Sequence, residues 1–305
     1  MKPLILASPD DSSAARALAD RLGADLGSAT IRSFPDGELY VRIDCSVAGR
    51  AVWLVCTLHP ASDKLLPLYF MAHTARDLGA ASVYLAAPYL AYMRQDHRFQ
   101  DGEGVTARYT GRLLSSAVDG LITVDPHLHR FAALDEVYSV PTRAVRAAPC
   151  IAEWVRGNVE RPVLVGPDAE SEQWVAAVAA QLGCPSLVLR KVRRGDREVA
   201  ISPIDEAQRD RGRSIDWARH TPVLVDDIVS TARTMIETLA QLRRVGALEP
   251  ICVGVHAVFS QSAYDDLRAA GAARVVTCNT IPHPSNAIDV MDLVAQAMAG
   301  FPHRS

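Results

Sequence analysis

The feature that most constrains the fold of this chain is the alternation of short apolar runs with segments of helical periodicity. The run 4–7 precedes a helical pattern at 13–22, and the run 223–225 precedes one at 231–245. Continuous apolar strands are typical of sheets buried on both faces, and strand–helix alternation is typical of parallel sheets. Two further expected strands, 121–124 and 187–189, have no helix assigned after them. The remaining expected strands, each with the helix that follows it, are 52–56 with 63–78, 83–86 with 106–117, 163–165 with 171–182, 251–258 with 262–270, and 275–278 with 286–299.

The length of the chain and a break in the alternation indicate two domains. A chain of 305 residues corresponds to about two domains of ordinary size. The alternation stops near 140–149 and then resumes. We therefore expect an α/β fold with a mostly parallel, doubly wound sheet in residues 1–145 and another in residues 146–305. The sequence leaves open whether the terminal helix packs back on the first domain.

Charge, hydropathy and cysteine spacing exclude several classes of protein. The net charge of −3 gives no general attraction to nucleic acid or to an anionic membrane. No apolar run reaches about 18 residues, and the first one is too short for a signal peptide. The six cysteines are scattered, with no Cys-x-x-Cys pair, so a zinc site or a disulfide framework is not expected. We expect a cytoplasmic protein without nucleic-acid or membrane partners.

The stretch with the most chemical content follows the apolar run 223–225. Two adjacent carboxylates, Asp226 and Asp227, end that run and precede a helical pattern. Ligands bind at the carboxyl ends of parallel strands, and the amino end of the next helix suits a phosphate. The carboxylates suit sugar hydroxyls, a divalent cation, or both; alternatively, Asp226 caps a helix and Asp227 is solvated. Three hydroxyl side chains lie in the turn: Ser230, Thr231 and Thr234.

A polar segment after the run 83–86 is a second candidate site. Arg94 and Gln95 fall in this segment, near the carboxyl end of an expected strand. An arginine can bind phosphate with two parallel hydrogen bonds, and a glutamine can contact the edge of a base. The alternative is an exposed polar loop without a ligand.

Two further strand ends carry possible metal ligands. Asp125, His127 and His129 follow the run 121–124 and share one face at a period of two. A carboxylate suits a hard cation, although a capping Asp and a structural His would give the same pattern. Asp168 lies just after the apolar run 163–165, at the end of another expected strand, and its default interpretation is that it caps the helix that follows.

The segment Phe-Pro-Asp-Gly-Glu at 34–38 predicts a tight turn, because Pro stands second and Gly fourth. Such a turn would hold Asp36 and Glu38 outward beside the Phe34 ring. An aromatic ring with two carboxylates could hold an adenine or its ribose. The alternative is a solvated turn.

A basic segment, Lys-Val-Arg-Arg-Gly-Asp-Arg at 191–197, lies within a long polar stretch at 191–213. A mobile loop that carries Lys191 and Arg193 could close over transferring phosphates and neutralise their charge. The alternative is an exposed charged loop. The sequence contains no Walker A motif, no Gly-x-Ser-x-Gly elbow and no His-Glu-x-x-His helix, which excludes those kinase, hydrolase and protease classes.

Taken together and in this order, these segments resemble those of the ribose-phosphate diphosphokinase family, also called phosphoribosyl pyrophosphate synthases. The Asp-Asp motif alone would indicate only the wider phosphoribosyltransferase fold, whereas the combination is more specific. Pro126 and His129 are similar to the short archaeal-type branch. The matching segments are 34–38, 88–96, 103–107, 125–127, 167–169, 191–194, 225–231, 256–259 and 279–282.

The resemblance implies an enzyme that transfers the β,γ-diphosphoryl group of ATP to O1 of ribose 5-phosphate, with Mg²⁺, in nucleotide biosynthesis. It implies two phosphoribosyltransferase-like domains and a homo-oligomer in which a neighbouring subunit completes the ATP site. The implied roles are ATP binding for Phe34, Asp36, Gly37, Glu38, Arg94 and Gln95; magnesium binding for His127 and Asp168; catalysis for Lys191 and Arg193; and ribose 5-phosphate binding for Asp226, Asp227, Ser230, Thr231, Ala232, Arg233 and Thr234.

The chain departs from the family at Ala232 and Arg233, where members usually carry a glycine in the phosphate loop. We therefore expect a loop whose dihedral angles are open to residues other than glycine. Two other functions stay open at this point. One is a phosphoribosyltransferase that consumes phosphoribosyl pyrophosphate, and the other is a non-catalytic relative that binds or regulates a synthase.

Overall fold

The chain divides into two compact units, Met1–Arg146 with Met291–Ser305, and Ala147–Val290. This computed structural model describes residues 2–302 except 195–197, 205–206, 208–214 and 261. The terminal segment belongs to the first unit, where helix α9 (Met291–Ala299) packs on α1 (Ser12–Leu22) and on strand β7 (Gly120–Val124). Arg21 of α1 forms an ion pair with Asp292 at the start of α9.

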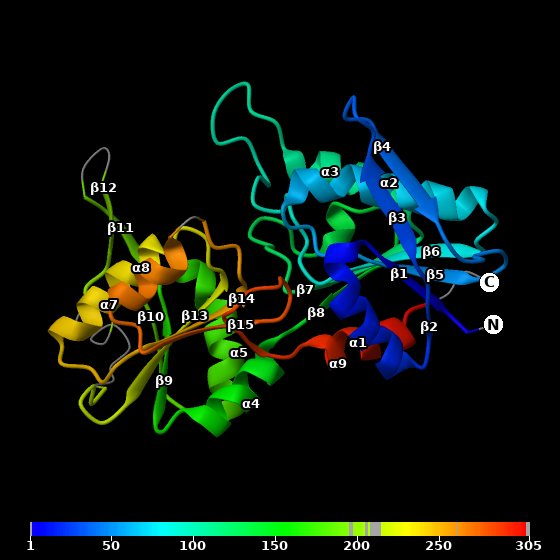
Figure 1. Cartoon of the computed structure of the whole chain (residues 1–305). Coiled ribbons are helices and arrows are strands. Elements are labelled where there is room, and N and C mark those ends of the chain that lie inside the picture. The colour runs from blue at the N-terminus through cyan, green and yellow to red at the C-terminus, as the bar shows by residue number, and fades with distance from the viewer. Residues whose placement is uncertain (1, 195–197, 205–206, 208–214, 261, 303–305) are drawn as a thin grey trace. The chain divides into compact units, whose positions relative to one another are not determined.

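The core of the first unit is a six-stranded parallel sheet in the order β2-β1-β5-β6-β7-β8 (Figure 1). Its central strands β1, β5, β6 and β7 are buried because nearly every side chain in them is apolar. Trp53 stacks on Tyr84 with ring centroids 4.9 Å apart. Phe301, which follows α9, meets both rings edge-on. The other elements are β1 (Leu4–Ala7), β2 (Asp25–Leu26), β5 (Ala51–Val55), β6 (Ser82–Ala87), β8 (Thr142–Val145), η1 (Pro9–Asp11), α2 (Ala61–Asp77), α3 (Thr106–Ala117) and η2 (Leu134–Glu136).

An antiparallel hairpin of β3 (Ala29–Ser33) and β4 (Leu39–Ile43) packs against α2 (Figure 1). The apolar runs of the sequence did not predict it. Both strands are short and only partly buried, so they lack the continuous apolar character of the central strands.

The second unit contains a parallel sheet with the order β10-β9-β13-β14-β15-β16. A separate antiparallel hairpin follows β10. None of the helices in the described ranges of either unit has the length and apolar character needed to cross a membrane. The elements are α4 (Ala148–Asn158), β9 (Pro162–Gly166), η3 (Ala169–Ser171), α5 (Glu172–Leu182), β10 (Ser186–Val188), β11 (Lys191–Arg194), β12 (Glu198–Ile201), β13 (Thr221–Ile228), α7 (Arg233–Arg244), β14 (Ile251–His256), α8 (Ala263–Ala269), β15 (Arg274–Cys278) and β16 (Asn286–Ile288).

The first unit passes into the second between Arg146 and Ala147, within the segment 140–149 where the alternation stops; this segment also contains β8 and the start of α4. One expectation from the sequence was wrong in detail. The terminal helix does not begin at 286, because β16 pairs with β15 first. The side chain of Asn286 donates to the Cys278 carbonyl at 2.9 Å and to Thr277 Oγ1 at 2.9 Å, which holds this segment at the sheet edge.

The two sheets have the same strand order when their strands are numbered along each unit. Both β1 and β9 are followed by Pro-Asp, at 9–10 and 167–168. With these pairs aligned, the ladder register places Thr57 and Leu58 where the second unit has the acidic pair 226–227. The fold and the aspartate after the first strand are therefore repeated, whereas the carboxylate pair at 226–227 has no equivalent at the matching positions of the first unit.

Candidate active site

Three carboxylates gather at the ends of β9 and β13 in the second unit. Asp227 is 4% exposed and Asp168 is 5% exposed, whereas Asp226 is half-buried. Asp226 Oδ1 accepts the N–H of Asp227 at 3.0 Å, and Asp227 Oδ1 accepts the N–H of Ile228 at 2.8 Å. Burial, and then the charges of Asp227 and Asp168, raise the pKa of Asp226 well above its ordinary value. This concentration of negative charge favours a bound cation or the hydroxyl groups of a ligand.

Helix capping was one interpretation of both Asp168 and Asp226, and the structure confirms it for Asp168 only. Asp168 does cap a helix, because its Oδ1 accepts the N–H of Glu170 at 3.0 Å in η3. Asp226 caps none: it lies within β13, and the residue at the cap position of α7 is Ala232. The capping alternative for Asp226 was therefore wrong.

Ala232 adopts a left-handed backbone conformation, with φ 58° and ψ 6°. The expectation that this loop uses dihedral angles open to residues other than glycine was wrong. A left-handed conformation costs about 1–2 kcal/mol for a residue with a Cβ. The Ala232 methyl is buried among core residues that include Met235 and Leu239, and burial of a methyl group offsets about 0.8 kcal/mol of that cost.

The left-handed residue lets β13 turn directly into α7, so that a short loop joins the carboxylates to a helix amino end. The residue at the cap position of α7 is Ala232, which has no side-chain acceptor, and the first N–H groups of this helix suit an anion. Ser230 and Thr234 are half-buried, whereas Thr231 and Arg233 are exposed.

Residues from β14 and the segment after it support this loop, and residue patterns alone gave them no role. The backbone N–H of Ser260 donates to the Ser230 carbonyl at 3.2 Å, and the N–H of Val229 donates to the His256 carbonyl at 3.2 Å. The His256 ring is 1% exposed and lies 2.9 Å from Thr280 Oγ1. These contacts join residues that are 24 to 30 positions apart, which is why local spacing could not reveal them.

The basic segment begins as strand β11, which pairs antiparallel with β12. Lys191 is opposite Ile201, and Arg193 is opposite Val199. The sequence predicted a long irregular stretch here and not a hairpin. The side chains of Lys191 and Arg193, and much of 195–214, lie outside the described residues, so the role of these two residues stays a prediction.

In the first unit, the predicted turn at 34–38 forms the tip of the β3–β4 hairpin. The N–H of Phe34 donates to the Glu38 carbonyl at 2.7 Å, and the N–H of Gly37 donates to the Phe34 carbonyl at 2.9 Å. Gly37 has φ 92°, which a residue with a Cβ rarely adopts. Asp36 and Glu38 are exposed, as expected, and the Phe34 ring is 40% exposed. The tip thus presents an aromatic ring and two carboxylates to solvent.

Arg94 and Gln95 lie in the loop between β6 and α3. Arg94 is exposed and Gln95 is half-buried, and the Gln95 carbonyl accepts the N–H of Ala107 at 3.3 Å. Tyr92, with φ 64°, turns the chain just before them. Within the described residues, no hydrogen bond or ring contact joins this pair to Phe34 at the hairpin tip.

At the end of β7, Asp125 and the two histidines lie in a segment that leaves the strand conformation. The rings of His127 and His129 lie side by side, with centroids 3.9 Å apart. Asp125 is fully buried, and its Oδ1 lies 3.5 Å from an Arg146 guanidinium nitrogen. Its φ of 33° is not a strand conformation, so the period-two alternation from which a shared face was expected does not continue through this residue. Asp168 belongs to the other unit, and a cation shared with His127 stays a prediction.

A pocket of about 280 Å³ lies in the first unit at the ends of β1 and β5. Lys64 lines it, and its Nζ is 2.8 Å from Asp11 Oδ2 and 3.6 Å from Asp10 Oδ2. Two carboxylates already neutralise this ammonium group, so the pocket does not favour a phosphate. The counterpart of the carboxylate site in the second unit is therefore not a second phosphate site.

Two family models match the chain: the N-terminal domain of ribose phosphate pyrophosphokinase over residues 4–117, and the phosphoribosyl transferase domain over residues 133–293. The ribose-phosphate pyrophosphokinase of Methanothermobacter thermautotrophicus is 34% identical over 285 residues, which cover 93% of this chain and 95% of that protein. The chain belongs to the ribose-phosphate pyrophosphokinase family. It is therefore a transferase of this family, as the motifs predicted.

Other relatives of the family agree over nearly the whole chain. The ribose-phosphate pyrophosphokinase of Methanopyrus kandleri is 33% identical over 297 residues, covering 97% of this chain and 98% of that protein. The crystal structure of phosphoribosylpyrophosphate synthetase from Mycobacterium smegmatis matches with a TM-score of 0.82 and 25% identity, covering 98% of both chains. The expectation of two phosphoribosyltransferase-like α/β domains is confirmed.

Proposed function

We propose that this chain makes 5-phosphoribosyl 1-pyrophosphate from ribose 5-phosphate and ATP, with release of AMP. The observation that carries the proposal is in the second unit, where the acidic end of β13 leads through one short loop into the amino end of α7, whose cap position is occupied by Ala232. Carboxylates and a helix amino end in succession suit a molecule with adjacent hydroxyls and a phosphate. Ribose 5-phosphate has both groups.

In this proposal the second unit holds the sugar phosphate. The carboxylates of Asp226 and Asp227 accept hydrogen bonds from the ribose hydroxyls. The N–H groups and hydroxyls of the loop 230–234 hold the 5-phosphate. The carboxylates lie close together, and their negative charges repel one another. Hydrogen bonds donated by the ribose hydroxyls would stabilise them.

The first unit holds the nucleotide in this proposal. Arg94 contacts the ATP phosphates and Gln95 the base, and both lie on one loop after β6. In a homo-oligomer, the exposed ring of Phe34 stacks on the adenine of ATP bound to a neighbouring subunit. Asp36 and Glu38 accept hydrogen bonds from the same nucleotide. An exposed aromatic ring on a well-defined turn is a suitable surface for such stacking.

The carboxylate of Asp168 suits a magnesium ion that accompanies the phosphates, because magnesium prefers oxygen ligands. Asp168 supplies a carboxylate at the acidic end of the second unit's sheet, and His127 supplies an imidazole in the first unit. Bound magnesium would neutralise phosphate charge and orient the diphosphoryl group. Burial, and then the charges of Asp227 and Asp168, raise the pKa of Asp226, and a bound cation would relieve the charge repulsion among these carboxylates.

The chemistry then needs positioning and charge neutralisation more than covalent catalysis. The O1 hydroxyl of the ribose forms a bond to the β-phosphorus and loses its proton to solvent, and the bond from that phosphorus to the α-phosphate oxygen breaks, which releases AMP. Lys191 and Arg193 neutralise charge on the transferring group.

The test is the formation of AMP from ATP, ribose 5-phosphate and Mg²⁺ by the purified chain. We expect AMP and 5-phosphoribosyl 1-pyrophosphate in equal amounts, with a strong decrease in an Asp226→Asn, Asp227→Asn double variant. A folded chain that forms no AMP under these conditions would contradict the proposal. Release of pyrophosphate from 5-phosphoribosyl 1-pyrophosphate and a base would indicate a phosphoribosyltransferase instead, and neither reaction would indicate a non-catalytic relative.

A further inference from the structure

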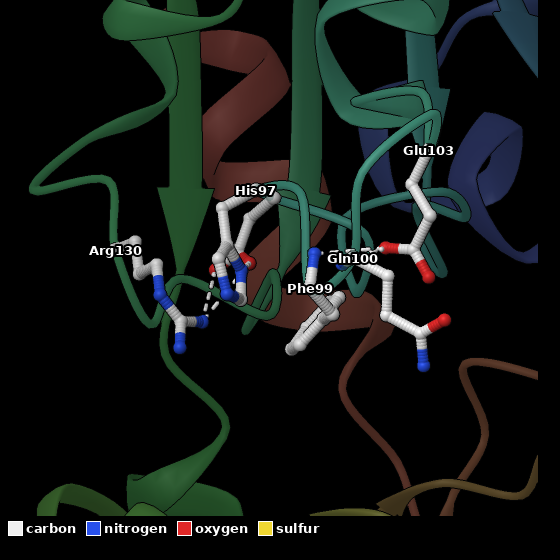
Figure 2. Close-up of polar contacts among 6 residues, drawn as sticks. His97, Phe99, Gln100, Glu103 and Arg130 are labelled. Atoms are coloured by element: carbon white, nitrogen blue, oxygen red, sulfur yellow. Dashed lines mark hydrogen bonds and ion pairs between the residues drawn. The ribbon is translucent and has the colours of Figure 1, made fainter.

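A network of polar contacts joins the loop that carries Arg94 and Gln95 to the loop after β7 (Figure 2). Asp96 directly follows these two residues, and its side chain is 2% exposed. One guanidinium nitrogen of Arg130 lies 3.1 Å from Asp96 Oδ1 and 3.3 Å from Oδ2. The two loops are thus held together by a buried carboxylate under an exposed arginine.

His97 contributes to the same contact. Its Nδ1 lies 3.1 Å from Asp96 Oδ1, and Figure 2 shows His97 and Arg130 pointing toward one another from the two loops. Burial raises the pKa of Asp96, but the hydrogen bond from His97 and the charge of Arg130 outweigh it, so the pKa is lowered overall. Asp96 is therefore an anion that attracts Arg130.

The rest of the loop is braced by its own contacts. A Glu103 carboxylate oxygen accepts the N–H groups of Phe99 at 2.8 Å and Gln100 at 3.2 Å. The His97 ring lies 3.8 Å from the Phe99 ring, centroid to centroid, and Arg130 lies 5.6 Å from the same ring. The loop is internally ordered, so a single contact at Asp96 can set the position of all of it.

We propose that Asp96 and Arg130 form a positioning pair for nucleotide binding. The pair fixes the adjoining Arg94 and Gln95 relative to the end of β7, where His127 lies. The inference rests on the proposed function, in which Arg94 and Gln95 contact ATP. Neither Asp96 nor Arg130 is assigned a contact with substrate; both act through their neighbours on the two loops.

A merely structural ion pair would behave differently, and the first unit contains one for comparison. Arg76 lies 3.0 Å from Asp119 Oδ1, just before β7 begins. Arg130 follows β7 at its other end. Both pairs join an arginine to a poorly exposed aspartate, but only the Arg130 pair adjoins the candidate nucleotide loop.

The experiment compares Arg130→Met with Arg76→Met in the full-length chain. Arg130→Met should raise KM for ATP by about ten- to a hundredfold, because small displacements of binding groups are costly. KM for ribose 5-phosphate should stay near the wild-type value. Arg76→Met should lower Tm and leave KM for ATP near wild type.

Conservative variants sharpen the test. Arg130→Lys should recover most of the ATP affinity, because one nitrogen makes both contacts to the carboxylate and an ammonium group can replace it. Asp96→Asn should raise KM for ATP, and its effect should not add to that of Arg130→Met, since both remove one interaction.

Equilibrium dialysis with labelled ATP and Mg²⁺ separates this inference from the proposed function. If the wild type binds ATP without forming AMP, and Arg130→Met weakens that binding, the positioning pair stands and the proposed reaction falls. If the wild type forms AMP but Arg130→Met leaves KM for ATP unchanged, or raises both KM values equally, the inference falls alone. A wild-type chain that binds no ATP overturns both.

Discussion

The N–H of Asp227 donates a hydrogen bond to Oδ1 of Asp226 at 3.0 Å, so that two neighbouring carboxylates are held at the end of one strand. This arrangement costs stability in the absence of a ligand, because burial and the charges of Asp227 and Asp168 oppose ionisation of Asp226. The cost is typical of a site in which function takes precedence over stability.

The first prediction concerns Asp226 and pH. Its pKa is raised in the folded state, so the folded chain holds a proton that the unfolded chain loses. Asp226 therefore destabilises the fold increasingly as pH rises from the unfolded pKa, about 4, through the folded pKa. Asp226→Asn should raise Tm relative to wild type at neutral pH, and the difference should shrink in acid.

Thermal unfolding between acid and neutral pH, without ligand or Mg²⁺, measures this difference. Asp135→Asn, at an exposed position in η2, is the control and should give no comparable trend. A Tm difference for Asp226→Asn that grows toward acid pH would contradict the expected sign.

The second prediction concerns the left-handed Ala232. Replacing it with glycine removes a backbone cost of about 1–2 kcal/mol, but loses a buried methyl worth about 0.8 kcal/mol and adds about 0.4–1 kcal/mol of unfolded-chain entropy. Ala232→Gly should thus change the free energy of unfolding by less than about 1 kcal/mol.

Ala179 in α5 is a matched control, because it is 7% exposed where Ala232 is 8% exposed. Ala179→Gly should cost about 1.5–2 kcal/mol, since helix propensity and methyl burial are both lost. Denaturant titration of the two variants measures the contrast. Equal losses would mean that the loop at Ala232 is not strained.

The third prediction concerns Lys191. Removal of one cation that stabilises the transferring phosphates should lower kcat by about 10²-fold or more, so Lys191→Ala should be nearly inactive while remaining folded. Arg190→Ala, at the exposed residue just before β11, controls for a general loss of positive charge. Steady-state AMP formation compares the two, and near wild-type turnover by Lys191→Ala would contradict the proposed mechanism.

The fourth prediction concerns the buried pair of Lys64 and Asp11. Lys64→Met leaves Asp11, which is 2% exposed, as an uncompensated buried charge, and this typically costs about 3–5 kcal/mol. The Lys64→Met, Asp11→Asn double variant should lose less than the two single variants combined. Urea unfolding measures these values, with KM for both substrates expected to stay unchanged at temperatures below Tm.

Arg42→Met breaks the exposed pair of Arg42 and Asp44 in the β3–β4 hairpin and serves as a control for Lys64→Met. Its Tm should stay close to wild type, because exposed ion pairs contribute little. If Lys64→Met changed KM for ribose 5-phosphate, the pocket in the first unit would have to be part of the substrate site.

Local patterns predicted the central elements well. The helix expected at 106–117 is found as α3 over Thr106–Ala117, and the strand expected at 121–124 is found within β7. These elements are encoded by apolar spacing over a few residues, and the same alternation of strands and helices occurs in both units. Because ligands bind at the carboxyl ends of parallel strands, the same patterns also identified the acidic pair at 226–227.

Hairpins and edge strands were harder to predict. The strands β3, β4, β8 and β16 are short, and most of their side chains are only partly buried. Their pairing depends on partners elsewhere in the chain, such as α2 beneath the β3–β4 hairpin. Short, half-exposed strands lack the continuous apolar run that makes a central strand recognisable.

Residue type and local spacing are enough to establish the α/β class, most central strands and helices, the family, and the strand ends at which candidate site residues lie. Three other features became known from the folded chain: α9 returns to α1, Ala232 is left-handed, and Arg130 holds Asp96. These features depend on residues brought together by folding over long distances in the chain, and on a backbone conformation that the side chain of alanine does not itself favour.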